Sequence, residues 1–372
     1  MKVTFPHMGY LWIPVSALLR KLGLDVVVPP PITRRTLSLG VQHAPEFACF
    51  PLKLNLGNFM EAYERGADTI IMAGGVGPCR FGYYAQVQQE ILWDLGYKMK
   101  MVVLEPPKGH WWGLWKRIRW LIGERSVRDL WRALGFAWHK FVALDAIERA
   151  ACWARPRAAA PRDVRRAVET AVRWVHEAET ADQVREAREE GVSLVRSHAV
   201  RSLRDPLKVG IVGEIYTLLE PFANYRLEEK LGALGVEVDR SLYLSDWIRA
   251  HVVLDALRVS GEHEVKQAAQ PYAPHFVGGH GQDTVGRTVL YARHGFDGVI
   301  QVMPFTCMPE IVAQSILPRV AHDYGIAVLT LIVDEHSADA GIQTRLEAFV
   351  DLLRRRRSKK KHDAVARAQA GK

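Results

Sequence analysis

Three of the four cysteines of this 372-residue chain lie in short loops that are rich in glycine and proline. These loops are His43-Ala-Pro-Glu-Phe-Ala-Cys-Phe-Pro-Leu-Lys53, Gly74-Gly-Val-Gly-Pro-Cys-Arg-Phe-Gly82 and Met303-Pro-Phe-Thr-Cys-Met-Pro-Glu310. A cysteine that serves as a small core hydrophobe usually lies inside a helix or strand, whereas sharply turning loops often hold ligands. Cys152, in the helical run Ile147-Glu-Arg-Ala-Ala-Cys-Trp153, fits core packing. We therefore predict a site with three thiolate ligands, from Cys49, Cys79 and Cys307.

The spacing of the three loop cysteines limits the kind of site that they form. Cys79 follows Cys49 by 30 positions and Cys307 follows Cys79 by 228, which excludes a local zinc-finger knuckle. Such distances fit a site in a cleft between two domains. A structural zinc ion would need a fourth ligand, for which His43 and His280 are candidates. Thiolate ligation also suits an iron–sulfur cluster, and three unrelated free cysteines are the remaining reading.

Two of the loop cysteines come shortly after predicted strands, at the carboxyl ends of those strands. Cys79 comes shortly after the predicted strand Asp68–Met72, and Cys307 comes shortly after the predicted strand Gly298–Met303. In open parallel sheets, binding crevices lie outside the carboxyl ends of the strands. Cys307 also precedes a predicted helix that begins near Pro309, where the helix dipole favours a thiolate.

Other polar residues at the predicted strand ends have two readings each. Glu214, in Gly213-Glu-Ile-Tyr-Thr217, either lines the cleft or caps the following helix. His280 lies in the glycine-rich loop Gly278-Gly-His-Gly-Gln-Asp-Thr284, a type of loop that sometimes cradles an anion. The run Asp334-Glu-His-Ser337 either carries protons or caps the last helix. We take Glu214 and His280 as candidate catalytic residues.

Alternating strand and helix patterns predict an α/β protein with two Rossmann-like parallel-sheet domains that face a cleft. Residues 1–105 form the first domain and residues 206–353 the second. Residues 106–205 read as an all-helical insertion that holds eight of the eleven tryptophans. Their rings either pack on a domain or second subunit, or fill the insertion's own core. Residues 354–372 read as a basic, disordered tail.

Composition places the chain among globular proteins of a reducing compartment. Few cysteines and no secretion signal predict a cytoplasmic location, and no stretch has the roughly 18 apolar residues of a membrane span. The net charge of +9 comes from the insertion and the tail, since residues 354–372 hold nine Lys/Arg against one Asp. We therefore expect no membrane partner and no nucleic-acid-binding fold.

The motifs together resemble the 2-hydroxyacyl-CoA dehydratase-like proteins. The resemblance rests on Glu46-Phe-Ala-Cys-Phe-Pro-Leu-Lys53, Gly77-Pro-Cys-Arg-Phe-Gly82, Gly213-Glu-Ile-Tyr216, Pro304-Phe-Thr-Cys307 and the run Asp334–Phe349. That group includes D-component-like subunits of 2-hydroxyglutaryl-CoA dehydratase and benzoyl-CoA reductase subunits. The chain is most similar to the branch labelled acyl-CoA dehydratase activase-related, or CoA protein activase.

This resemblance implies a 4Fe–4S cluster held by Cys49, Cys79 and Cys307 between the two domains. It implies low-potential electron transfer to, or dehydration or reduction of, a small substrate such as an acyl-CoA. The implied partners are a separate ATPase of the actin, Hsp70 or sugar-kinase type and a homologous subunit. The chain has no Asp-x-Gly-Thr phosphate loop, so we do not expect it to hydrolyse ATP. It departs from the family at Asp339, where a glutamate is common, and in its long insertion. The alternative function is a non-catalytic partner or scaffold with a structural metal.

Overall fold

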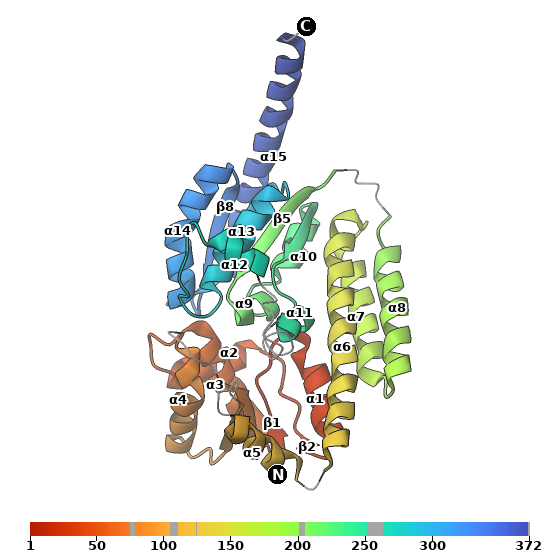
Figure 1. Ribbon diagram of the computed structural model, residues 1–372, viewed down its shortest axis with the longest axis vertical. Helices are drawn as coiled ribbons and strands as arrows, with labels where there is room; N and C mark the ends of the chain where they lie inside the picture. Colours follow the sequence, from red (N-terminus) through yellow and green to blue (C-terminus); the bar gives the residue numbers. More distant parts are fainter. Residues whose placement is uncertain (75–78, 105–110, 124, 201–204, 251–262, 371–372) are drawn as a thin grey trace.

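Two four-stranded, all-parallel sheets form the framework of the protein (Figure 1). The computed structural model describes residues 1–74, 79–104, 111–123, 125–200, 205–250 and 263–370. The first sheet has the order β2-β1-β3-β4 and the second the order β6-β5-β7-β8. The first comprises β1 (Lys2–Thr4), β2 (Asp25–Val26), β3 (Thr69–Ala73) and β4 (Lys100–Leu104); the second comprises β5 (Leu207–Gly213), β6 (Val236–Arg240), β7 (Gly298–Pro304) and β8 (Ala327–Val333). The predicted class, α/β with Rossmann-like parallel sheets, is confirmed.

Helices cover the second sheet, which explains its nearly continuous apolar strands. All seven residues of β7 are buried, as parallel strands covered on both faces require. The covering helices include α13 (Gly281–Arg293) and α14 (Met308–Tyr324), which contact β5 and β8 respectively. Shorter helices in this half are α9 (Ile215–Leu219), α10 (Leu227–Ala233), α11 (Leu244–Ile248) and α12 (His263–Ala269).

A buried helix in the first half carries Cys49 at its start. This helix, α3 (Phe50–Glu64), packs against α2 (Arg34–His43) so closely that glycine is needed at the crossing. A Cβ at Gly40 would lie 1.8 Å from the Lys53 carbonyl oxygen, and one at Gly57 would lie 1.9 Å from that of Thr36. Helices α1 (Trp12–Lys21) and α4 (Phe81–Asp94) complete this half.

Sequence patterns did not predict α2, although its start carries a clear signal. The Thr33 hydroxyl accepts a hydrogen bond from the backbone N–H of Thr36, and the Thr36 hydroxyl accepts one from the N–H of Thr33. This reciprocal arrangement is a capping box built from two threonines. The usual box has a glutamate or glutamine at the third helical position, so the pattern was easy to overlook.

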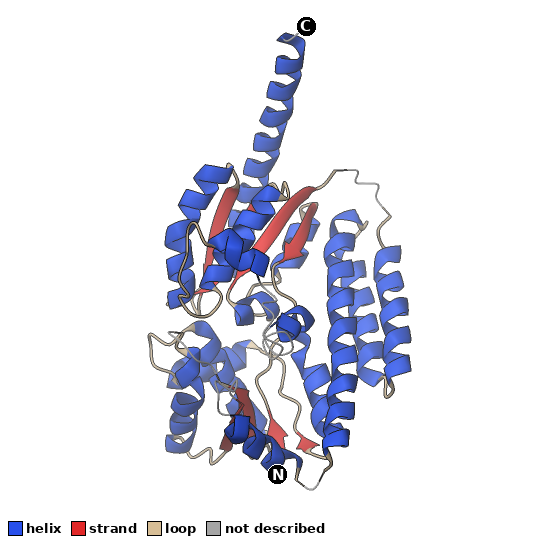
Figure 2. Ribbon diagram, viewed as in Figure 1, coloured by secondary structure: helices blue, strands red, loops and turns tan. Residues whose placement is uncertain are grey.

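Between the two sheets in the chain lies a helical segment, as predicted (Figure 2). It comprises α5 (Trp111–Ile122), α6 (Val127–Ala154), α7 (Pro161–Glu177) and α8 (Ala181–Ser197). The core of α6–α8 consists mainly of alanine and valine. None of the described tryptophan side chains of the segment is fully buried, although Trp174 packs against this core from its edge. The tryptophans therefore do not fill the core.

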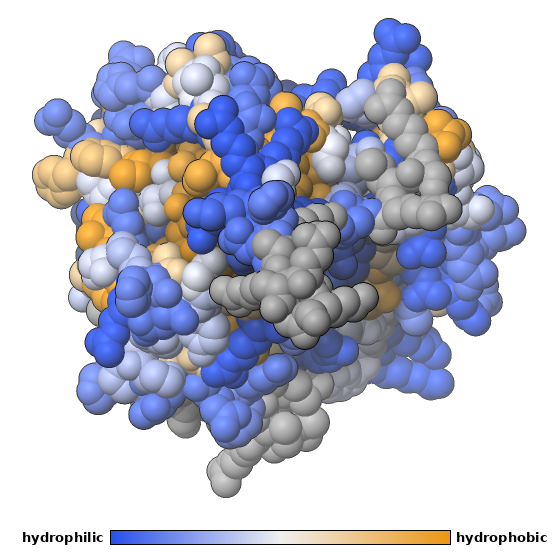
Figure 3. Space-filling model, turned by 90° about the horizontal axis from the view of Figure 1, so that it is seen from above, coloured by the Kyte–Doolittle hydropathy of each residue, from blue (hydrophilic) through white to orange (hydrophobic). Residues whose placement is uncertain are grey.

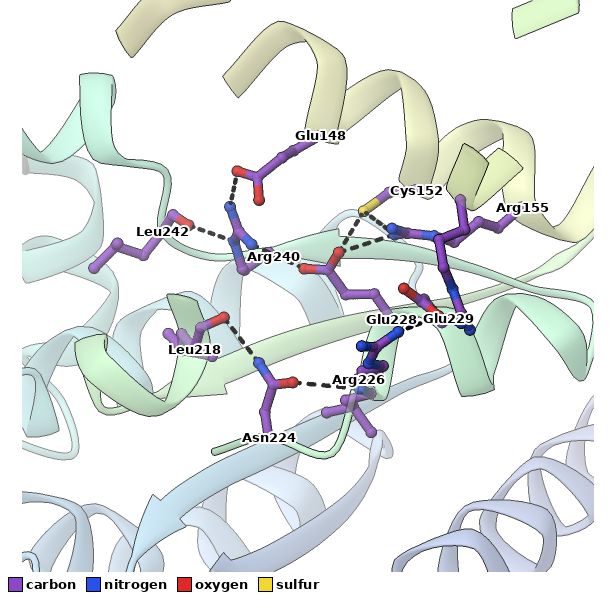
Figure 4. Close-up of polar contacts among 12 residues, drawn as sticks. Glu148, Cys152, Arg155, Leu218, Asn224, Arg226, Glu228, Glu229, Arg240 and Leu242 are labelled. Carbon is purple, nitrogen blue, oxygen red and sulfur yellow. Dashed lines mark hydrogen bonds and ion pairs between the residues drawn. The ribbon is translucent and has the colours of Figure 1, made fainter. Parts of the chain in front are cut away.

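Helix α6 joins the segment to both halves of the molecule, because it packs on α1 and also on β6 and α11. Its contact with the second half is a buried polar cluster centred on Arg240 (Figure 4). The Arg240 guanidinium donates to Glu148 of α6 over 2.7 Å and to Glu228 of α10 over 3.0 Å. Arg155, at the end of α6, donates to Glu228 over 2.9 Å. Charged pairs of this kind fix orientation at the cost of desolvation.

The C-terminal helix is longer than the sequence predicted. We expected a helix over Ile342–Leu353 and a disordered tail over 354–372, but α15 runs from Asp339 to Ala370 and projects from the body (Figure 1). Arginine and lysine are good helix formers, and arginines of the tail bond back to the body. Arg354 donates to the Leu234 carbonyl and Arg356 to that of Gly325.

Two further observations concern the extent of the helices. The predicted helix Ser245–Leu257 corresponds to α11, and its part from residue 251 onward lies outside the described residues. Among the helices that the structure describes, none is both long and apolar enough to cross a membrane.

Candidate functional site

Each of the three loop cysteines lies at the start of a helix. Cys49 is the N-cap residue of α3, Cys307 is the N-cap residue of α14, and Cys79 lies one position before the N-cap of α4. The first backbone N–H groups of a helix have no partner within the helix and carry partial positive charge. All three thiols therefore lie where anionic sulfur is favoured.

Arg80 connects the three cysteine loops. Its Nη1 donates to the Phe47 carbonyl over 2.9 Å, and its Nη2 donates to the carbonyl and, over 3.0 Å, to the hydroxyl of Thr306. The Thr306 hydroxyl in turn donates to the Phe47 carbonyl over 3.2 Å. Phe47 and Thr306 precede Cys49 and Cys307 by two residues and one residue. A single guanidinium next to Cys79 thus holds the loops of both domains together.

Two further features fix the geometry of these loops. Thr306 has a φ of 66°, a left-handed conformation that is uncommon for a β-branched residue and that reverses the chain just before Cys307. Lys53, buried on α3, donates to the Glu46 carbonyl and forms an ion pair with Glu335 at the end of β8. The lysine therefore ties the Cys49 loop to the second domain by a separate contact.

Electrostatics indicate that the three thiols share one neighbourhood. Burial raises the pKa of Cys49 to about 12, and burial also raises the pKa values of Cys79 and Cys307. The charge of Glu214 adds to each of these three shifts, and Cys49 interacts with both other thiols. Backbone N–H groups of the following helices act in the opposite direction, lowering the pKa of each thiol. A cation bound here would stabilise the thiolates further.

Glu214 is a helix cap that faces this neighbourhood. Its carboxylate accepts hydrogen bonds from the backbone N–H groups of Tyr216 and Thr217, both over 3.0 Å, at the start of α9. The capping reading is therefore confirmed. Burial raises the pKa of Glu214 despite these hydrogen bonds. Because its charge reaches all three thiols, the capping role does not remove it from the candidate site.

His280 lines a cavity of about 520 Å³ at the carboxyl ends of β5 and β6. The residue after β6, Ser241, and the last residue of β5, Gly213, form part of the wall. The remaining wall comes from α11 with the residues that flank it and from α13. It is mixed in character, comprising Leu242, Tyr243, Asp246, Trp247, Arg249, Ala250, Asp283, Thr284 and Arg287. Gly213 directly precedes Glu214, so the cavity adjoins that residue.

Glu310 is a buried carboxyl group that sequence reasoning missed. It lies three residues after Cys307 and accepts hydrogen bonds from the Thr284 hydroxyl over 3.0 Å and from Gln301 Nε2 over 2.9 Å. Burial raises its pKa to about 7, and the charge of Glu214 contributes. In the sequence, Glu310 is an acidic residue in the first turn of a predicted helix. Acidic residues are common there because they interact favourably with the helix dipole, so the position did not stand out.

This raised pKa predicts a pH dependence of stability. The unfolded chain releases the Glu310 proton near the usual value of 4.5, whereas the folded chain keeps it up to about 7. The free energy of unfolding should therefore fall by roughly 3 kcal/mol as the pH rises through this window. Urea unfolding of Glu310→Gln should lack this decline. Glu347→Gln, changed at an exposed position of α15, should keep it. Parallel curves for the wild type and Glu310→Gln would refute the assignment.

The other polar residues singled out from the sequence have structural partners. Asp334 accepts from the Ser337 hydroxyl over 2.8 Å, and Asp339 pairs with Lys230 over 2.9 Å. The glycine loop packs against the start of α14, because a Cβ at Gly281 would lie 2.4 Å from the Pro309 carbonyl oxygen. His43 is the last residue of α2. Among the described residues, nothing groups the His43 side chain with the three cysteines as a fourth ligand.

The thiols of the three loops are donors that a metal–sulfur group or a metal ion could use. In the part of the chain that the structure describes, no three His, Cys, Asp or Glu side chains are grouped as ligands of one metal ion. A cubane has a wider requirement, since its thiolates lie about 6–7 Å apart when each metal–sulfur bond is near ~2.3 Å. The free thiols and the helix N-termini suit such an anionic group. Both the cluster and the zinc alternative stay predictions.

Cys152 belongs to a different part of the molecule, as expected. It is buried on α6 in the cluster around Arg240, where its thiol donates to Glu228 over 3.4 Å (Figure 4). Burial raises its pKa, and the charges that act on it are those of Glu228, Arg155, Arg240 and Glu148. It therefore serves as part of a polar contact as well as in packing.

No model of a known protein family matches this chain, and no curated protein matches it significantly. The resemblance to the 2-hydroxyacyl-CoA dehydratase-like proteins therefore rests on the quoted motifs alone.

Proposed function

We propose that this protein is an iron–sulfur protein of the 2-hydroxyacyl-CoA dehydratase-like type, in which Cys49, Cys79 and Cys307 hold one 4Fe–4S cluster. The observation that carries the proposal is the convergence of three loops, from two domains, on Arg80. Three thiols that form no disulfide, at the starts of three helices, need a reason to be brought together. A thiolate-bound group accounts for all three at once.

When bound, such a cluster supplies low-potential electron transfer and, with three protein ligands, one iron that is open to substrate. The chain's own residues have simpler roles. Arg80 orients the loops. Its positive charge lowers the pKa of Cys49 and of Cys79, against the effect of burial. Glu214 places its carboxyl group beside the thiols, and His280 lines the cavity that would admit a small substrate, with an acyl-CoA as our first candidate.

The surface around the cysteine loops supports a role for partner proteins. Exposed apolar side chains flank each loop, namely Phe47, Tyr83, Phe305, Met308 and Ile311. Figure 3, which views the molecule from the α15 end, shows a further group of hydrophobic residues on its left, the side on which α14 lies in Figure 1. Patches of this kind mark docking surfaces. We propose that this surface receives a separate ATPase of the actin, Hsp70 or sugar-kinase type, or a homologous subunit.

Anaerobic purification with iron and acid-labile sulfide analysis tests the cluster. We expect brown protein with about four iron and four sulfide per chain after anaerobic reconstitution. Protein that stays colourless and iron-free would contradict the proposal. Stoichiometric zinc in its place would support the structural-metal alternative.

The apolar surface around the loops also favours a second candidate function, in which the chain is a non-catalytic partner or scaffold. The cluster would then relay electrons or have a structural role. The EPR signal of the reduced protein separates the two candidates. A change on addition of acyl-CoA compounds indicates an enzyme. A signal that is indifferent to each of them, with a stable complex with a second protein, indicates a scaffold.

A further inference from the structure

Helix α5 and the start of α6 form one surface whose inner side is fixed by packing. Ile118 and Ile122 of α5 and Leu130 and Ala133 of α6 belong to one apolar cluster, together with Leu18 and Leu22 of α1. The inward face of both helices is therefore occupied. Helical spacing then determines which residues face away from the body.

The outward side of these two helices is aromatic. Trp112 and Trp120 lie eight residues apart with Lys116 between them, so the three form a stripe on the face opposite Ile118 and Ile122. Trp112 is 68% exposed and Trp120 47% exposed. On α6, a second exposed stripe consists of Val127, Trp131 and Leu134, and Trp131 is 69% exposed. We call these five apolar residues and Lys116 the α5–α6 surface.

Positive charge accompanies the tryptophans. Residues 111–135 contain six Lys and Arg but only Glu124 and Asp129 as acids. Asp129 is turned into the N-cap of α6, where it accepts from the Ser126 hydroxyl over 2.7 Å. The Lys100 ammonium lies 3.8 Å from the ring centroid of Trp120, so a cation covers one of the rings. The surface thus combines exposed aromatic rings with an excess of positive charge.

We propose that the α5–α6 surface binds the headgroup region of an anionic lipid bilayer. Tryptophan prefers this region, because its ring is apolar and its N–H is polar, and Lys and Arg pair with anionic headgroups. The surface lies at the end of the molecule opposite the projecting α15 (Figure 1). Binding of this kind places exposed rings in the headgroup region and needs no spanning helix.

Charge complementarity favours a bilayer over a protein partner. The apolar residues are separate tryptophans set among cations, whereas the core of a protein interface is depleted of charged residues. An anionic membrane offers a continuous field that attracts Lys116 together with the nearby exposed Arg128 and Arg132. From the lack of a spanning segment we expected no membrane partner, and none of the described helices could span a bilayer. A helix that lies in the interface needs no such length, so this proposal departs from that expectation.

Vesicle co-sedimentation tests the proposal. We expect the wild type to bind vesicles of phosphatidylglycerol and phosphatidylcholine, and to bind those of phosphatidylcholine alone much less. The triple variant Trp112→Ser/Trp120→Ser/Trp131→Ser leaves the net charge unchanged. It should bind the anionic vesicles at least about tenfold less, because the inserted rings are lost. Quenching of tryptophan fluorescence by brominated lipid should fall in parallel. All three positions are exposed, so circular dichroism should show an unchanged fold.

Two variants serve as matched controls. Trp153→Ser changes an exposed tryptophan near the other end of α6, roughly 33 Å along the helix from Trp131, and should bind like the wild type. Arg355→Gln/Lys359→Gln/Lys360→Gln, in the basic part of α15, should also retain binding. Loss of binding in the α15 variant but not in the triple tryptophan variant overturns the proposal. So does a wild type that ignores vesicles, or that forms a dimer which the triple variant abolishes.

Discussion

Replacing any one of the three loop cysteines with alanine should abolish, or reduce to near background, the iron and sulfide content of the anaerobically reconstituted protein. Each of Cys49→Ala, Cys79→Ala and Cys307→Ala removes one thiolate from a three-cysteine site and leaves two irons without a protein ligand. The fourth cysteine, Cys152, is buried in the Arg240 cluster, and the charges that act most strongly on it belong to that cluster, so we do not expect it to replace the lost thiolate. Iron and sulfide analysis with visible absorption spectra measures the effect.

Cys152→Ala is the control that the chain itself provides. Its thiol packs on α6 and donates to Glu228, so its loss should lower the free energy of unfolding by about 1 kcal/mol while leaving the iron content unchanged. A Cys79→Ala protein with full iron content would remove that residue from the site. A Cys152→Ala protein that folds but loses its iron would contradict the separation of the two regions.

Position in a loop before a helix was enough to distinguish the three site cysteines from Cys152. The strands could also be predicted, because β5, β7 and β8 are short apolar runs that recur with helical patterns between them. Both signals are local in sequence. They need no knowledge of how the two domains are arranged.

The residues that organise the site have no such local signal. Arg80 stands in a quoted motif, but its hydrogen bonds to Phe47 and Thr306 cross between domains and depend on tertiary packing. The same is true of Lys53, which pairs with a glutamate 282 positions away. An isolated arginine or lysine in a sequence is most often a solvated surface residue. Contacts of this kind become visible only once the sheets are placed.

The tryptophans of the insertion illustrate a different limit. Apolar residues at helical spacing predicted helices correctly, but not which face would be buried. In the structure, mainly small residues fill the core between α6, α7 and α8, and most of the described tryptophan rings lie outside it. Where alanine and valine form the core between helices, aromatic residues at helical spacing can lie on the exposed face instead.

Arg240→Met should destabilise the protein by roughly 3–5 kcal/mol at neutral pH. Arg240 is 4% exposed, and its loss leaves the mostly buried carboxylate of Glu148, whose side chain is 19% exposed, without its ion-pair partner. Glu228 is affected less, because Arg155 still binds it. The pKa values agree with this difference. Burial raises the pKa of Glu148, whereas for Glu228 the two arginines outweigh burial and lower the pKa. Urea unfolding followed by circular dichroism measures the change.

The pH dependence of that loss identifies its cause. Without Arg240, the folded-state pKa of Glu148 should rise further above its unfolded value, so the variant loses stability as the pH rises past about 4.5. The gap between variant and wild type should thus narrow toward acidic pH, and Glu148→Gln in the variant should recover much of the loss at neutral pH. Arg185→Met, at the exposed pair with Asp182, should cost less than about 1 kcal/mol. If Arg240→Met costs no more than Arg185→Met, or its effect does not depend on pH, then the buried cluster does not hold α6 to the second domain.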